Sequence, residues 1–209
     1  MRPSRMLRLK SAPRYMINLF FWVLFRFDKW HLRNVSTIRH YQNLASQMAI
    51  EQHPEFVIEL GCGLGEISRK LPRHLEKYLI DFDSNLELPI RFFFAGHNYK
   101  FFPLDLKKAK ELVDALPAND KALLLIFINS AHNLSVSELK ILLNCISTKF
   151  NVSKILIDLT TAGARSFRHD IDSLDSILKL ESYTSVEDLS LEFGQDSGIA
   201  VLSPKLDII

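Results

Sequence analysis

FVIELGCGLGEISRKLPRHLEKYLIDFD, residues 56–83, is the stretch of this 209-residue chain that decides the fold. It reads as a buried strand, a turn with glycines at Gly61, Gly63 and Gly65, a helix, and a second strand that ends in acids. Glycines at this spacing let the backbone bend sharply and approach a ligand closely, and the following helix offers unpaired N–H groups. The stretch therefore predicts that a small polar ligand binds on the turn.

Two acids narrow the chemistry of that ligand. The turn has the spacing G-x-G-x-G with Glu59 two residues before the first glycine, whereas dinucleotide-binding domains space their glycines G-x-G-x-x-G. A carboxylate at this point would repel a pyrophosphate, but it suits a positively charged amine. Asp81 closes the second strand, where a carboxylate can accept hydrogen bonds from ribose hydroxyls. A ligand with a ribose and a cationic amino-acid end suits both acids.

This pattern resembles the class I S-adenosylmethionine-dependent methyltransferases, and the resemblance extends over roughly residues 56–204. In that family the ExGxGxG turn holds the methionine portion of S-adenosylmethionine, an acid that ends the second strand holds the ribose, and an acid after the third strand holds the adenine amine. The resemblance implies the following cofactor-binding residues: Glu59, Gly61, Cys62, Gly63, Gly65, Asp81, Phe82, Asp105 and Asn129. A nicotinamide-binding or nucleotide-free Rossmann domain is the structural alternative.

Strands and helices alternate along the rest of the chain, as a doubly wound α/β fold requires. We expect strands at 56–60, 77–81, 99–103, 122–128, 154–159, 177–186 and 198–203, and helices at 66–75, 85–95, 107–116, 135–148 and 165–174. The expected fold is a Rossmann-like, mainly parallel seven-stranded sheet, and the family resemblance implies that its last two strands form an antiparallel hairpin. Ser135 and Glu138 have capping-box spacing, whereas Pro89 indicates a helix that begins late or is kinked.

Charge divides the chain into two parts. Residues 1–40 carry nine Lys and Arg against one acid, Asp28, whereas the rest of the chain has 17 basic and 23 acidic residues. The two parts therefore have net charges of +8 and −6, in agreement with +2 overall. We predict a basic, aromatic-rich helical arm at 1–45 and a methyltransferase domain at 46–209. Because the domain is acidic, nucleic acid is a disfavoured partner.

Within the arm, the apolar run Tyr15–Phe25 allows three interpretations. It can form a lid packed over the domain, an interfacial helix that brings residues 1–40 to an anionic membrane surface, or a homodimer interface. The run is too short to span a bilayer, which needs about 20 apolar residues. Cys62 and Cys145 form neither a disulfide framework nor a zinc motif, so we expect no metal. We expect a cytoplasmic protein, peripheral at the inner face of the membrane if the arm is interfacial.

The sequence narrows the choice of methyl acceptor mainly through the motifs that it lacks. The segment Asn129–Leu134 has neither the Asn/Asp-Pro-Pro-aromatic motif of family members that methylate nucleobase amines nor the Pro-Cys motif of those that methylate cytosine carbon. A hydroxyl or carboxyl on a small molecule or glycan is therefore favoured, with His132 and His169 as candidate bases. The segments FDKWH and ELGCGLG also resemble bacterial methyltransferases of surface-polysaccharide synthesis, which implies a lipid-linked glycan. An RNA methyltransferase and a non-catalytic cofactor-binding scaffold are the alternatives.

Overall fold

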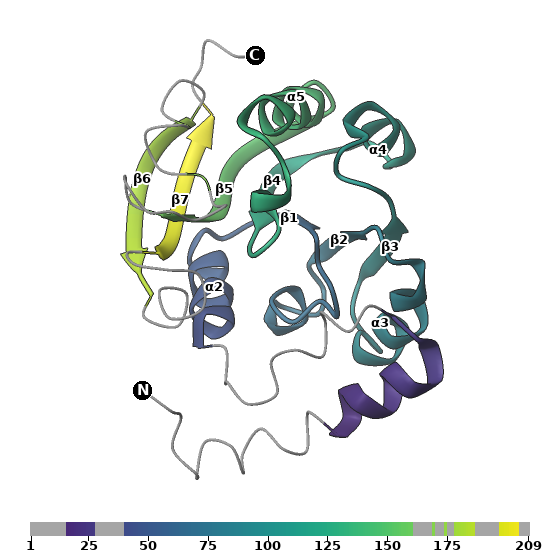
Figure 1. Ribbon diagram of the computed structural model, residues 1–209. Coiled ribbons are helices and arrows are strands. Elements are labelled where there is room, and N and C mark those ends of the chain that lie inside the picture. Colours follow the sequence, from purple (N-terminus) through teal and green to yellow (C-terminus); the bar gives the residue numbers. More distant parts are fainter. Residues whose placement is uncertain are drawn as a thin grey trace.

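A seven-stranded sheet in the order β3-β2-β1-β4-β5-β7-β6 forms the centre of the computed structural model, which describes residues 16–27, 40–160, 169, 174, 178–186 and 197–204 (Figure 1). The strands are β1 Phe56–Leu60, β2 Glu76–Asp81, β3 Tyr99–Pro103, β4 Asn119–Phe127, β5 Phe150–Thr160, β6 Leu178–Ser185 and β7 Ser197–Pro204. The helices are α2 His40–Glu51, α3 Glu87–Phe93, α4 Ala109–Ala115 and α5 Val136–Ser147, with 3₁₀ turns η2 Ser68–Lys70, η3 Ser84–Leu86 and η4 Ala131–Asn133. Residues 16–25 form a further helix.

The strand pairing confirms the predicted fold class. Strands β3, β2, β1, β4 and β5 are parallel neighbours, and β7 pairs antiparallel with both β5 and β6. The order reverses between β1 and β4, because the chain winds first toward β3 and then toward β5. Ligands of open α/β sheets bind beyond the carboxyl ends of the strands at such a reversal.

Side chains of the central strands alternate between two buried faces, as covered parallel strands require. Ile58 and Leu125 belong to the core beneath α4 and α5, whereas Val57 and Leu124 belong to the core beneath α2. Helix α3 and the helix at 16–25 share a third cluster on the same side as α2 (Figure 1). The result is a layer of helices on each face of the sheet.

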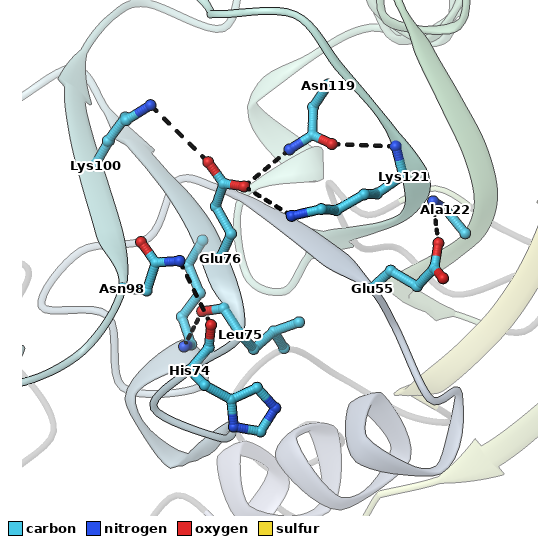
Figure 2. A network of polar contacts seen from close by, with 10 residues as sticks. Glu55, His74, Leu75, Glu76, Asn98, Lys100, Asn119, Lys121 and Ala122 are labelled. Carbon is cyan, nitrogen blue, oxygen red and sulfur yellow. Dashed lines mark hydrogen bonds and ion pairs between the residues drawn. The ribbon is translucent and has the colours of Figure 1, made fainter.

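Glu76 holds the amino ends of three strands together, at the end of β2 opposite to Asp81 (Figure 2). Its carboxylate lies 3.9 Å from the ammonium of Lys100 on β3, accepts a hydrogen bond of 3.0 Å from the Asn119 amide of β4, and lies 3.3 Å from the Lys121 ammonium. The charges are partly exposed, so each pair contributes modestly to stability. The polar residues at this end of the sheet therefore make contacts within the protein that join its strands.

The helix predicted at 66–75 is wrong, because the segment contains only the short turn η2. Leu71 is extended, with ψ 158°, since it precedes Pro72, whose ring disfavours the helical conformation in the preceding residue. Pro89 behaves as predicted: α3 begins at Glu87, so the proline lies in the first turn, where no N–H is needed. The helix predicted at 165–174 lies outside the described residues, apart from His169 and Leu174.

The helix at 16–25 packs on the domain by one of its sides. Phe21 is 8% exposed and its ring centroid lies 4.9 and 5.3 Å from those of Phe92 and Phe93 at the end of α3. Phe27, just after the helix, is buried in the same cluster. This is the packing expected of a lid. The predicted division of the chain at residue 45 falls inside α2 and stays a prediction.

The amino end of α5 offers a test of local folding energetics. Ser135 accepts a hydrogen bond from the Glu138 amide at 3.2 Å, and the Glu138 carboxylate accepts one from the Ser135 amide at 2.7 Å, which is the predicted capping box. We expect Ser135→Ala to lower the free energy of unfolding by about 1 kcal/mol, because a helix amide loses its acceptor. Urea denaturation measures the change. Asn144→Ala, on the exposed side of the same helix, is the control and should not destabilise the protein.

Candidate functional site

The turn after β1 is tied to the neighbouring strand β2 through its backbone. The amides of Gly61 and Cys62 both donate to the carbonyl of Ile80, at 2.8 and 2.9 Å, and the Gly65 amide donates to the Cys62 carbonyl at 2.8 Å. These bonds hold the turn at the carboxyl ends of β1 and β2. The turn therefore occupies the point where the strand order reverses.

Two of the glycines are required by both conformation and space. Gly61 and Gly65 have φ of +69° and +65°, a region that side chains strongly disfavour. A Cβ atom on Gly61 would lie 2.3 Å from the Cβ of Ser130, and one on Gly65 would lie 2.3 Å from the ring of Phe94. The first contact brings the turn against the loop after β4, and the second brings it against α3. Any larger residue would push these elements apart.

Asp81 makes structural hydrogen bonds and also lines a cavity. Its carboxylate is almost fully buried and accepts hydrogen bonds from the amides of Gly63, at 2.9 Å, and Asp83, at 3.1 Å. It also lines a cavity of about 390 Å³ together with Phe82, Asp105 and other residues of the loops after β2, β3 and β4. The Phe82 ring is 69% exposed and Asp105 accepts a bond from the Lys107 amide at 2.9 Å. The structure thus brings five of the predicted residues to one cavity: Gly61, Asp81, Phe82, Asp105 and Asn129.

Glu59 lines a second, smaller cavity of about 60 Å³, whose wall also includes Gly61 to Leu64 of the turn. Its carboxylate is buried and accepts a hydrogen bond from the Ser68 amide at 3.1 Å. Burial raises the pKa of Glu59 to about 7, although the Ser68 hydrogen bonds act in the opposite direction. A cationic group in this cavity would favour the ionised carboxylate. The α2 residues Tyr41 and Gln42 form part of its wall.

Asn129 and Gly61 line both cavities, so they mark the place where the two cavities meet. Asn129 has a φ of +60°, which asparagine tolerates better than most residues. Its backbone amide donates a hydrogen bond to the Asp158 carboxylate at 2.7 Å. Asp158 lies on β5 and is 2% exposed. The Asp158 carboxylate therefore stabilises the left-handed conformation of Asn129, where the two cavities meet.

The sequence analysis missed Asp158, Tyr41 and Gln42. An acid near the carboxyl end of an otherwise apolar strand was the available signal for Asp158. No comparable signal marks Gln42, whose amide donates to the Glu66 carboxylate across the small cavity. This contact depends on how α2 packs beside the glycine turn.

The candidate bases His132 and His169 both lie near the end of β4, although neither is among the residues that line the two cavities. The His169 ring is buried, and its Nε2 lies 3.1 Å from the Ala131 carbonyl. Because a carbonyl only accepts, we assign a proton to Nε2. His132 is half-buried in η4. Within the described ranges, no three His, Cys, Asp or Glu side chains gather as a metal site would require.

Comparison with solved structures identifies the fold. The N-methyltransferase NodS from Bradyrhizobium japonicum, crystallised with S-adenosyl-L-homocysteine, is 11% identical with a TM-score of 0.61, over 79% of this chain and 86% of that one. Magnesium protoporphyrin IX methyltransferase from Synechocystis, with bound S-adenosylmethionine, is 13% identical with a TM-score of 0.58, over 90% and 91% of the two chains. No protein-family model matches this chain, and neither does a curated protein sequence. The chain has the fold of the class I S-adenosylmethionine-dependent methyltransferases.

The raised pKa of Glu59 generates a prediction about stability. Because the folded state binds this proton more tightly than the unfolded state between pH 4.5 and 7, the stability contributed by protonated Glu59 is lost as the pH rises through that window. Glu59→Gln removes this loss and keeps an oxygen for the Ser68 amide. We compare the free energy of unfolding of the variant with that of the natural protein. From pH 4 to pH 8, we expect this difference to change by up to about 3 kcal/mol in favour of the variant.

Urea denaturation of the ligand-free protein at both pH values measures this gain. Glu51→Gln, at the exposed end of α2, is the matched control and should show no comparable pH-dependent gain. An equal difference between Glu59→Gln and the natural protein at the two pH values would contradict the raised pKa.

Proposed function

We propose that this protein is an S-adenosylmethionine-dependent methyltransferase. The observation that carries the proposal is the pair of adjoining cavities at the glycine turn, with Glu59 lining one and Asp81 lining the other. When bound, S-adenosylmethionine supplies a methyl group already activated on a sulfonium. Asp81 would hold the ribose hydroxyls, Glu59 would favour the cationic amino-acid end, and Phe82 and Asp105 would hold the adenine. Asn129 would lie close to the reacting centre, because it lines both cavities.

Binding of the cofactor tests the proposed ribose contact. We expect S-adenosylmethionine to bind the natural protein and Asp81→Ala to bind it at least about tenfold more weakly, because charge-assisted hydrogen bonds are lost. Isothermal calorimetry measures the affinity. Asp120→Ala, exposed at the amino end of β4, is the control and should bind as the natural protein does. Unchanged affinity in a folded Asp81→Ala would remove the ribose assignment.

For the acceptor, the proposal is a hydroxyl on a small molecule or glycan, including a lipid-linked glycan. Its support is the loop after β4, where Asn129 is followed by Ser130 and Ala131 and not by the proline and aromatic residues typical of enzymes that methylate nucleobase amines. Alignment of the acceptor with the methyl group, together with one base to remove the hydroxyl proton, suffices for this reaction. The test measures release of S-adenosylhomocysteine in the presence of hydroxylated compounds, glycan lipids or transfer RNA. Release with the first two supports the proposal, whereas release with transfer RNA alone would indicate RNA methylation.

The histidines provide the second functional test. We expect His132→Gln or His169→Gln to lower turnover on the true acceptor by roughly 10²–10⁴-fold, with cofactor affinity nearly unchanged, because a general base acts in the chemical step. His74→Gln, exposed before β2, is the matched control. Normal turnover in both variants would leave alignment of the acceptor as the main source of catalysis. Cofactor binding without turnover on any acceptor would favour the scaffold alternative.

A further inference from the structure

The helix at 16–25 has nine apolar residues and one polar residue, Asn18, although only one side of it packs on the domain. Phe21 faces the domain and is 8% exposed, whereas Ile17, Phe20, Val23 and Leu24 are 45–61% exposed. A helix that is apolar on every side is normally covered on every side. The outward side of this helix therefore calls for a partner that the described part of the chain does not supply.

Helix α3 extends the same apolar surface. Leu88 and Phe92 are separated by one helical turn, so they lie on one side of α3, and they are 50% and 62% exposed. Phe92 also contacts Phe21, with ring centroids 4.9 Å apart, which joins the two helices. We call the exposed side chains of Ile17, Phe20, Val23, Leu24, Leu88 and Phe92 the apolar ridge. Most of the exposed large apolar side chains in the described ranges gather on these two helices.

Three arginines lie on or beside the two helices of the ridge. Arg26 follows the helix, is exposed, and has its guanidinium 5.7 Å from the centroid of the Trp22 ring. Arg91 on α3 is exposed beside Glu87, and the Arg69 guanidinium lies 5.2 Å from the Phe93 ring. In the sequence, residues 1–40 add further positive charge, with nine Lys and Arg against Asp28. Apolar side chains bordered by arginines match the chemistry of an anionic lipid surface.

We propose that the apolar ridge docks on the surface of a bilayer that contains anionic lipid. Among the described residues, no helix combines the length and apolar character needed to cross a membrane. The helix would lie along the interface, with its outward side chains among the acyl chains and its arginines at the headgroup phosphates. Its inward side remains on the domain in the cluster that contains Leu64 of the glycine turn. The docked helix would therefore hold the cofactor cavities close to the membrane surface.

Flotation of the full-length protein with vesicles tests this proposal, without cofactor or acceptor, so that its outcome does not depend on methyl transfer. We expect binding to vesicles of equal parts phosphatidylcholine and phosphatidylglycerol, and much weaker binding to phosphatidylcholine alone or at high salt. The double variant Phe20→Ser, Leu24→Ser should lower the partition coefficient at least about tenfold, because apolar burial is lost. Arg26→Gln should lower it roughly fivefold.

The matched control is Ile141→Ser, since Ile141 is 57% exposed on α5, on the opposite face of the sheet. It should bind vesicles as the natural protein does. Thermal unfolding measured by circular dichroism should be unchanged in all variants. Loss of vesicle binding can then be attributed to the ridge and not to loss of folding. Absence of the natural protein from the floating fraction would overturn the proposal. Failure to bind, combined with a dimer that dissociates in the double variant, would assign the ridge to a homodimer interface.

Discussion

The hydrogen bond from the Gly63 amide to the Asp81 carboxylate connects the turn after β1 with the end of β2, and the candidate site depends on this connection. It holds a buried acid in the lining of the larger cavity and fixes the turn that lines the smaller one. The close approach of Gly61 to Ser130 adds the loop after β4 to the same arrangement. Because the hydrogen bond needs the carboxylate of Asp81 and the close approach needs the absence of a side chain at Gly61, few substitutions at these two positions preserve the arrangement.

Glu59 illustrates the energetic cost of such a site. Its burial beside the turn raises its pKa to about 7, so the ionised form destabilises the folded protein when no cation is present. The hydrogen bond from the Ser68 amide to this carboxylate offsets part of the cost. It also orients the chain after the glycine turn. A buried acid with a perturbed pKa in a cavity is typical of functional positions. The same residue thus weakens the ligand-free fold when it is ionised, and in the proposed function it would interact with the cationic end of the cofactor.

The amino-terminal helix connects the surface of the protein to this site. Phe21 and Phe27 share a buried cluster with Leu64 of the turn and with Phe94, whose ring contacts Gly65. Packing of the helix therefore stabilises the turn, while its opposite side stays exposed. The lid and membrane interpretations of the apolar run are compatible, since they use different sides of one helix. In the proposed docking, a binding surface and a structural support are combined in the same segment.

The sequence alone determined the features that depend on neighbouring residues. The glycine turn, the capping box of Ser135 and most of the α/β alternation follow from local spacing, and the structure confirms them, whereas the helix predicted at 66–75 is wrong. The tertiary structure decided what depends on strand register and helix packing: the bond from Asn129 to Asp158, 29 residues away, the contact of Gln42 with Glu66, and the approach of His169 to Ala131. It also decided which side of the helix at 16–25 stays exposed, because a pattern of nine apolar residues and one Asn does not specify its buried side.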